Sequence, residues 1–210
     1  MTNGLSEFDH EDLLRFWFTE EPDDPVKAGE RFKLWFNATA EFDQRITGEF
    51  SSTLEQAITG DLDHWTITAR GSLALIVLFD QITRTIYRGE ARAYGYDHRA
   101  LAIAENSIAK GFDLEVEFIE RLMFYLPFEH GEDIELQNKC ADYFQVLDDI
   151  AAPGFKNITE SCLKSGKEHR EVIKRFGRFP HRNKILGRPS TPEEIAWASG
   201  HHGWGQTLNK

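Results

Sequence analysis

The fold is decided by a stretch in the first half of the chain, residues 71–84, which reads GSLALIVLFDQITR. Seven consecutive apolar residues, 73–79, would cover every face of a helix, and an all-apolar helix belongs at the centre of a protein core. A buried β-strand is the competing interpretation of so short a run, but no alternating pattern elsewhere could pair with it. The stretch therefore predicts a central helix over residues 72–83 in an all-α fold.

Apolar residues recur at helical spacing through most of the remaining chain. They step by four from Phe42 to Ile58, and Gly60 follows where a helix C-terminus favours glycine. Asp97 is the predicted N-cap of the fourth helix, and Pro127 is the predicted end of the fifth. About eight helices are expected: one capped by Ser6 and ending near Pro22 and Pro25, then 38–58, 72–83, 98–110, 114–126, 132–150, 156–176 and 190–197.

The connections between these helices are short, so successive helices should pack as antiparallel hairpins. A chain of 210 residues is long enough to bury roughly 70% of its unfolded surface as one domain. We expect a single domain over residues 1–198, followed by a flexible, glycine-rich tail over 199–210. No full tetratricopeptide (TPR) signature repeats along the chain.

The composition excludes several classes of protein. With 24 basic and 35 acidic residues the net charge is −11, which argues against general nucleic-acid binding. The longest apolar run has seven residues, whereas a membrane helix needs about 20, and residues 1–10 lack the features of a signal peptide. Cys140 and Cys162 lie in helical patterns without further ligands, as in reduced proteins. The expected location is the cytoplasm, with no membrane partner.

The charge is uneven along the chain. Residues 164–188 hold nine basic and two acidic residues, so one basic island of seven surplus positive charges lies within an acidic protein. This island is the region where an anionic ligand is most expected.

Charged and aromatic residues concentrate in three stretches, 80–84, 126–130 and 175–183. Each stretch closes the C-terminal end of a predicted helix, namely the third, the fifth and the seventh. Alternate helices of an up-and-down array point the same way, so the three stretches should meet at one edge of the molecule. This edge is the predicted functional site.

The residue types at this edge suit the binding of a small anion. Arginine offers forked donors to a carboxylate or phosphate, nearby carboxylates can orient the arginines, and histidine exchanges protons near neutral pH. The candidate ligand-binding residues are Asp80, Gln81, Arg84, Glu129, His130, His169, Arg175, Arg178, His181, Arg182 and Asn183.

Several interpretations of this cluster stay open. Arginines at helix ends can serve only structure, in a network with the acidic residues, and a TPR-like array can instead hold a peptide. In an enzyme of the hydrolase type, His181 or His169 would be the general base, oriented by Asp80 or Glu129. No spacing typical of a metal site is present, nor is a glycine-rich phosphate loop or a nucleophile elbow, so no metal and no cofactor are expected.

The chain resembles the bacterial domain-of-unknown-function family 924. The resemblance runs from residues 16–18 to residues 190–195 and rests on the segments 71–76, 80–81, 84, 86–89, 125–130 and 169–183. Where the family usually has Asp-Gln-Phe-Pro-Arg-Asn, this chain has DQITRT at residues 80–85, which keeps Asp80 and Arg84. The resemblance implies a TPR-like helical array and no particular activity.

Overall fold

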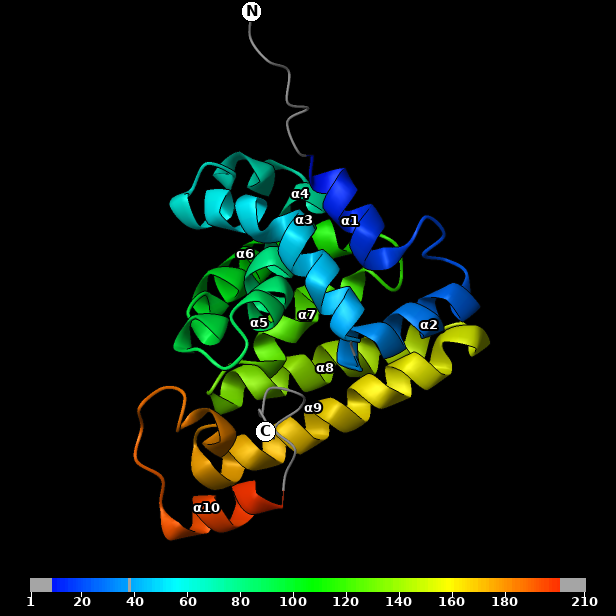
Figure 1. The fold of residues 1–210 in the computed structure, drawn as a ribbon. Helices are drawn as coiled ribbons and strands as arrows, with labels where there is room; N and C mark the ends of the chain where they lie inside the picture. The colour runs from blue at the N-terminus through cyan, green and yellow to red at the C-terminus, as the bar shows by residue number, and fades with distance from the viewer. Residues whose placement is uncertain (1–8, 38, 201–210) are drawn as a thin grey trace, which may run out of the picture.

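The computed structural model describes residues 9–37 and 39–200, and within these residues it contains helices and no strand (Figure 1). The all-α prediction is therefore confirmed, while the TPR-like arrangement stays a prediction. The α-helices are α1 (His10–Phe18), α2 (Pro25–Phe36), α3 (Ala40–Thr59), α4 (Ala69–Ile76), α5 (Thr83–Ile86), α6 (Asp97–Ala109), α7 (Arg121–Glu129), α8 (Ile134–Ile150), α9 (Lys156–Phe176) and α10 (Pro192–Ser199).

The apolar stretch forms the centre of the core, as predicted. Helix α4 continues into a π-helical turn, η2 (Val77–Ile82), and then into α5, and residues 73–79 have no exposed surface. Helices α1, α6 and α7 pack against α4. Gly71 allows the close approach at its start, because a Cβ there would lie 2.2 Å from the carbonyl oxygen of Trp65.

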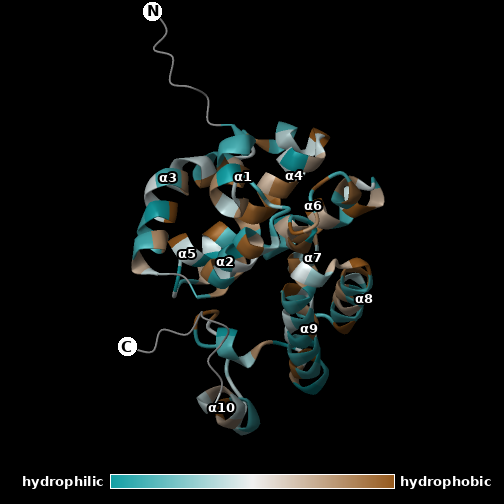
Figure 2. Ribbon diagram, turned by 90° about the vertical axis from the view of Figure 1, so that its right-hand side faces the viewer, coloured by the Kyte–Doolittle hydropathy of each residue, from teal (hydrophilic) through white to brown (hydrophobic). Residues whose placement is uncertain are grey.

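Helices α8 and α9 form a long hairpin along one side of the molecule (Figure 1). The predicted helix over 156–176 is confirmed, and Gly177 ends it in the left-handed conformation, with φ of 69°. Hydrophobic residues line the inward faces of α4 and α7, whereas α9 is largely hydrophilic (Figure 2). None of the helices in the described residues is long and apolar enough to cross a membrane.

Four expectations about the helices are wrong. The helix predicted over 114–126 begins only at Arg121, because residues 112–120 form the short 3₁₀ turn η4 (Phe112–Leu114) and further turns. Pro25 begins a helix that was not predicted, α2, because the Asp24 carboxylate accepts bonds from the first backbone N–H groups and proline fits the first turn. Pro127 lies inside α7 instead of ending it, since residues 122–129 are all buried and their packing outweighs the cost of an internal proline. Asp97 does not cap α6: Tyr96 holds that position.

Some expectations concern residues outside the described part of the chain. They are the Ser6 cap, the first residue of the predicted helix over 38–58, and the tail beyond residue 200. The described part of that helix, α3, runs through Gly48 without a break.

Candidate functional site

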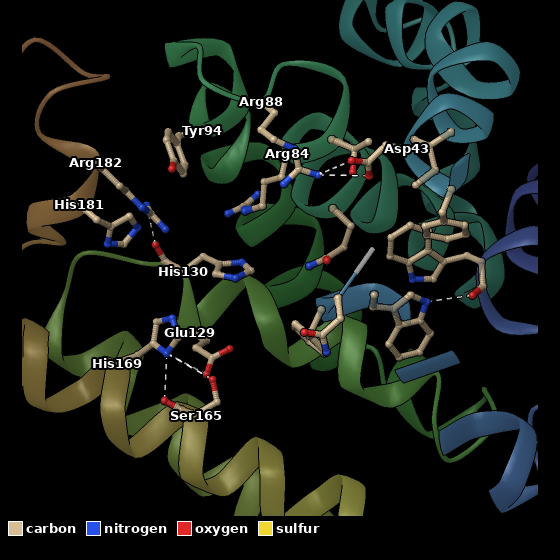
Figure 3. A pocket seen from close by; sticks show the side chains of 18 residues that line it. Asp43, Arg84, Arg88, Tyr94, Glu129, His130, Ser165, His169, His181 and Arg182 are labelled. Carbon is tan, nitrogen blue, oxygen red and sulfur yellow. Dashed lines mark hydrogen bonds and ion pairs between the residues drawn. The ribbon is translucent and has the colours of Figure 1, made fainter. Parts of the chain in front are cut away.

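One cavity of about 280 Å³ lies where the N-terminal helices face α7, α9 and the segment after α9 (Figure 3). Helices α1, α2 and α3 supply an aromatic wall, and the turn η2, helices α5 and α7, and the loop after α9 supply polar side chains. The cavity thus has an aromatic end and a polar end.

At the polar end, Asp80 is fully buried in the π-helical turn and anchors its neighbours. Its Oδ1 lies 2.7 Å from Nδ1 of His130, and its Oδ2 accepts a bond of 2.6 Å from the Gln81 amide. Burial would raise the pKa of Asp80, but the charges of His130 and Arg84 lower it to about 2. An ionised carboxylate only accepts hydrogen bonds, so Nδ1 of His130 carries the proton and Nε2 is the second functional atom of the ring.

Two buried arginines share one acidic partner beside this pair. Nη2 of Arg84 lies 3.0 Å from Oδ1 of Asp97, and Nη1 of Arg182 lies 3.4 Å from Oδ2 of the same carboxylate. Both guanidinium groups stand over the ring of Tyr94, at 5.8 and 4.6 Å from its centroid. Asp80 and Asp97 together balance the charges of the two arginines.

Among the buried polar atoms at this end that have no hydrogen-bond partner in the described residues, two matter for a ligand. They are Nε of Arg182, whose residue is 6% exposed, and the hydroxyl of Tyr94, whose residue is 8% exposed. Both side chains line the cavity, and in Figure 3 the Tyr94 hydroxyl points toward the space between Arg84 and Arg182. An unpaired buried polar group costs about 1–3 kcal/mol, so these atoms favour a partner in the cavity.

Glu129 and His169 form a second buried pair below His130. Nδ1 of His169 lies 2.9 Å from the Ser165 carbonyl oxygen and 3.3 Å from Oε1 of Glu129. Burial raises the pKa of Glu129 to about 7, although His130 and the Ser165 hydroxyl act against this rise. Burial also lowers the pKa of His169 to about 3, which keeps its ring neutral. Glu129 is therefore able to exchange a proton near neutral pH.

The Glu129–His169–Ser165 group is not a nucleophilic triad. In such a triad the acid and the hydroxyl contact opposite nitrogens of the imidazole. Here the Ser165 hydroxyl, at 3.4 Å, and the Glu129 carboxyl lie near the same nitrogen, Nδ1. A carbonyl can only accept, so Nδ1 donates its proton to the Ser165 backbone.

The structure brings most of the predicted residues together and places three elsewhere. Seven of the predicted residues line the cavity: Gln81, Arg84, Glu129, His130, His169, His181 and Arg182. Asp80 supports the wall of the cavity through its contact with His130. Arg175 lies on the surface, 2.6 Å from Glu193, and Arg178 binds Glu194 at 2.7 Å. Asn183 is fully buried and bonds to Ser190 and Arg188. These three side chains hold the segment after α9 in place.

Sequence reasoning missed the residues that come from outside the three stretches. Asp97 is predicted only as a helix cap, and Tyr94 lies between the helices predicted over 72–83 and 98–110. The aromatic wall was missed altogether, although the aromatic density of the first 50 residues was the signal that could have marked it. Its members are Trp17, Trp35, Phe36 and Phe42.

The described residues contain no group of three or more His, Cys, Asp or Glu side chains arranged to hold a metal ion. The fold and the site thus define an all-α protein whose candidate site is a cavity that is polar at one end and aromatic at the other. Residues 13–201 match the family model for a bacterial protein of unknown function, DUF924, and the chain belongs to this family.

A solved structure with the same fold comes from Agrobacterium tumefaciens, the protein of unknown function ATU0120. It is 36% identical to this chain with a TM-score of 0.76, and the match covers 91% of this chain and 97% of that one. The search of curated proteins found no match.

Proposed function

We propose that the cavity binds a small organic anion, a carboxylate or a phosphate, with Arg84 and Arg182 as the principal donors. The observation that carries this proposal is the unpaired Nε of Arg182, in a side chain that is almost completely buried and lines the cavity. Guanidinium groups bind oxyanions through directed N–H bonds, and such bonds are strongest away from water.

The neighbours of Arg182 support this assignment. The unpaired Tyr94 hydroxyl can donate a bond to the same anion, and the neutral acid form of Glu129 would not repel it. A cavity of about 280 Å³ favours a small molecule over an extended peptide.

Thermal-shift and calorimetric titrations with phosphate, acetate and succinate at constant ionic strength test this proposal. A bound anion raises the free energy of unfolding by about 2.7 kcal/mol at 100 times its Kd, so the melting temperature should rise with concentration. We expect Arg182→Gln to abolish the rise and Tyr94→Phe, which removes only the hydroxyl, to weaken binding. Arg175→Gln, on the surface, is the matched control.

Two results would overturn the proposal. One is that no anion in the panel stabilises the wild-type protein. The other is that both cavity variants bind the anions as tightly as Arg175→Gln does.

The Asp80–His130 contact favours a second candidate function, general-base catalysis on an anionic substrate. A carboxylate that binds Nδ1 of a histidine orients the ring and leaves Nε2 to accept a proton, as in many hydrolases. His130, and not His181 or His169, would then be the base. A panel of phosphate and carboxylate esters tests this role: His130→Asn should abolish hydrolysis while the melting temperature is retained. Hydrolysis that persists in this folded variant would exclude it.

A further inference from the structure

The aromatic end of the cavity is built from three helices. Trp17 of α1 and Trp35 of α2 stack with their ring centroids 5.9 Å apart and an interplanar angle of 7°. Nε1 of Trp35 donates a bond of 3.0 Å to the Trp17 carbonyl oxygen, which holds the Trp35 ring in this position. The ring centroid of Phe42, in α3, lies 6.3 Å from that of Trp17, and Phe36 also lines this end of the cavity. The arrangement is rigid and presents aromatic surface to the cavity.

A hydrogen-bond donor lies within this apolar wall. Trp17 is 3% exposed, and its Nε1 has no hydrogen-bond acceptor in the described part of the chain. Buried tryptophan usually finds a partner for this N–H group. An acceptor on a ligand would satisfy it, so the aromatic end suits a group that is flat and apolar but carries a lone pair.

The cavity is large enough for a ligand with both a ring and an anionic group. An apolar protein cavity of about 150 Å³ can hold benzene. A cavity of about 280 Å³ therefore has room for one ring of this size together with a carboxylate or phosphate.

We infer that the ligand is a small aromatic or heteroaromatic acid, with its anionic group at Arg84 and Arg182 and its ring against Trp17. A hydroxyl or ring nitrogen on the ligand accepts from Nε1 of Trp17. This inference rests on the proposed anion site, which it extends by naming the organic part of the ligand.

Matched probes separate the two parts of the inference. Calorimetry with the wild-type protein compares acetate with benzoate, phosphate with phenyl phosphate, and benzoate with 4-hydroxybenzoate and nicotinate. We expect the ring to increase affinity at least tenfold, and a correctly placed acceptor to increase it by a further severalfold. Benzyl alcohol, which has the ring without the charge, should bind much more weakly than benzoate.

Three variants locate the ring. Phe36→Ala should reduce the gain from the ring severalfold, and it is well tolerated because Phe36 is 50% exposed at the end of α2. Trp17→Phe keeps a ring but removes the N–H group, so it should remove the advantage of 4-hydroxybenzoate or nicotinate over benzoate. Trp197→Phe changes a tryptophan of α10, outside this cavity, and should leave binding unchanged.

The outcomes distinguish this inference from the proposed function. If acetate and phosphate bind through Arg182 but the ring adds no affinity, the inference is wrong and the anion site stands. If benzyl alcohol binds as well as benzoate and Arg182→Gln has no effect, the anion site fails, and the combined ligand fails with it. If no probe binds, both are overturned.

Discussion

Nδ1 of His130, at the C-terminal end of α7, lies 2.7 Å from Oδ1 of Asp80 in the π-helical turn η2. This contact joins two segments that are 50 residues apart in the sequence. Asp80 also lies 3.5 Å from Nη2 of Arg84, and Arg84 donates a second bond to the Asp80 backbone carbonyl. Asp80 is thus the point at which the polar end of the cavity is attached to the core.

Asp80→Asn should lower the free energy of unfolding by roughly 3–5 kcal/mol at pH 7, as is typical when one partner of a buried ion pair is removed. The reason is that Arg84 would keep its buried charge without this carboxylate. Because the pKa of Asp80 falls to about 2 on folding, its contribution is present above about pH 4 and is lost as the pH falls toward 2. Urea unfolding at several pH values measures the difference.

Asp43→Asn is the matched control for Asp80, since Asp43 lines the same cavity and pairs with Arg88 at 3.1 Å. Both members of this pair are about one-third exposed, so its loss should cost about 1 kcal/mol or less. Equal losses in the two variants would show that Asp80 is not the anchor of the polar end.

Glu129→Gln should stabilise the protein in mildly alkaline solution. The pKa of Glu129 rises from an ordinary 4.5 to about 7 on folding, so between these values the folded state holds a proton that the unfolded state has lost. Stability therefore falls as the pH rises through this window. Glutamine removes this titration, and the variant should gain up to about 3 kcal/mol over the wild type between pH 4.5 and pH 8.5.

The difference between Glu129→Gln and the wild type is the informative quantity, because His169 adds an opposite slope below pH 6.5 in both proteins. Glu105→Gln, in a surface pair with Lys139, is the control. A difference that does not change with pH would contradict the prediction. The charged and titratable groups around Glu129 are Asp80, His130, Cys140, Cys162, Glu168 and His169.

Gly71→Ala should lower the free energy of unfolding by about 3 kcal/mol or more, because its Cβ would overlap the Trp65 carbonyl oxygen at the start of the central helix. Gly48→Ala should change the free energy of unfolding in the opposite direction. No atom lies within 4 Å of a Cβ at position 48, so alanine should stabilise α3 by about 0.5–1 kcal/mol. Thermal unfolding should show a lower melting temperature for Gly71→Ala and a higher one for Gly48→Ala. A Gly71→Ala protein as stable as the wild type would show that residue 71 does not pack closely against the Trp65 carbonyl oxygen.

Asp97→Asn should change stability and anion binding in opposite directions. The carboxylate partly neutralises Arg84 and Arg182, so its loss destabilises the folded protein but strengthens the attraction of both guanidinium groups for an anion. We expect roughly tenfold tighter binding of phosphate, which corresponds to about 1.4 kcal/mol. Calorimetry at constant ionic strength measures it, and weaker binding would show that Asp97 orients the arginines more than it neutralises them.

Helix boundaries could be predicted where neighbouring residues decide them. Gly177 after α9 and the Thr191–Glu194 capping box before α10 act within one helical turn, and the helices predicted over 156–176 and 190–197 correspond to α9 and α10. Pro127 did not follow its local preference. The packing of the residues around it in α7 depends on contacts with other helices, which no sequence window contains.

The charged residues of the site were also predictable in part from the sequence, whereas the rest depended on the tertiary structure. The three helix-end stretches identified Asp80, His130 and Arg182, because helix direction in an up-and-down array follows from the order of helices along the chain. The same argument could not separate Arg182 from Arg178, which lies four residues before it. Arg182 lines the cavity, whereas Arg178 binds Glu194. Both are arginines after the same helix, and only the path of the loop distinguishes them.

Hydrophobic periodicity, glycine and capping residues were sufficient to predict an all-α chain and its central apolar helix, because these are properties of residues close in sequence. The tertiary structure alone decided which charges are buried together, which nitrogens lack a partner, and that Trp17 and Trp35 of α1 and α2 face the arginines across one cavity. Those features depend on the packing of helices distant in sequence, and packing sets burial, and with it the pKa values of Asp80 and Glu129.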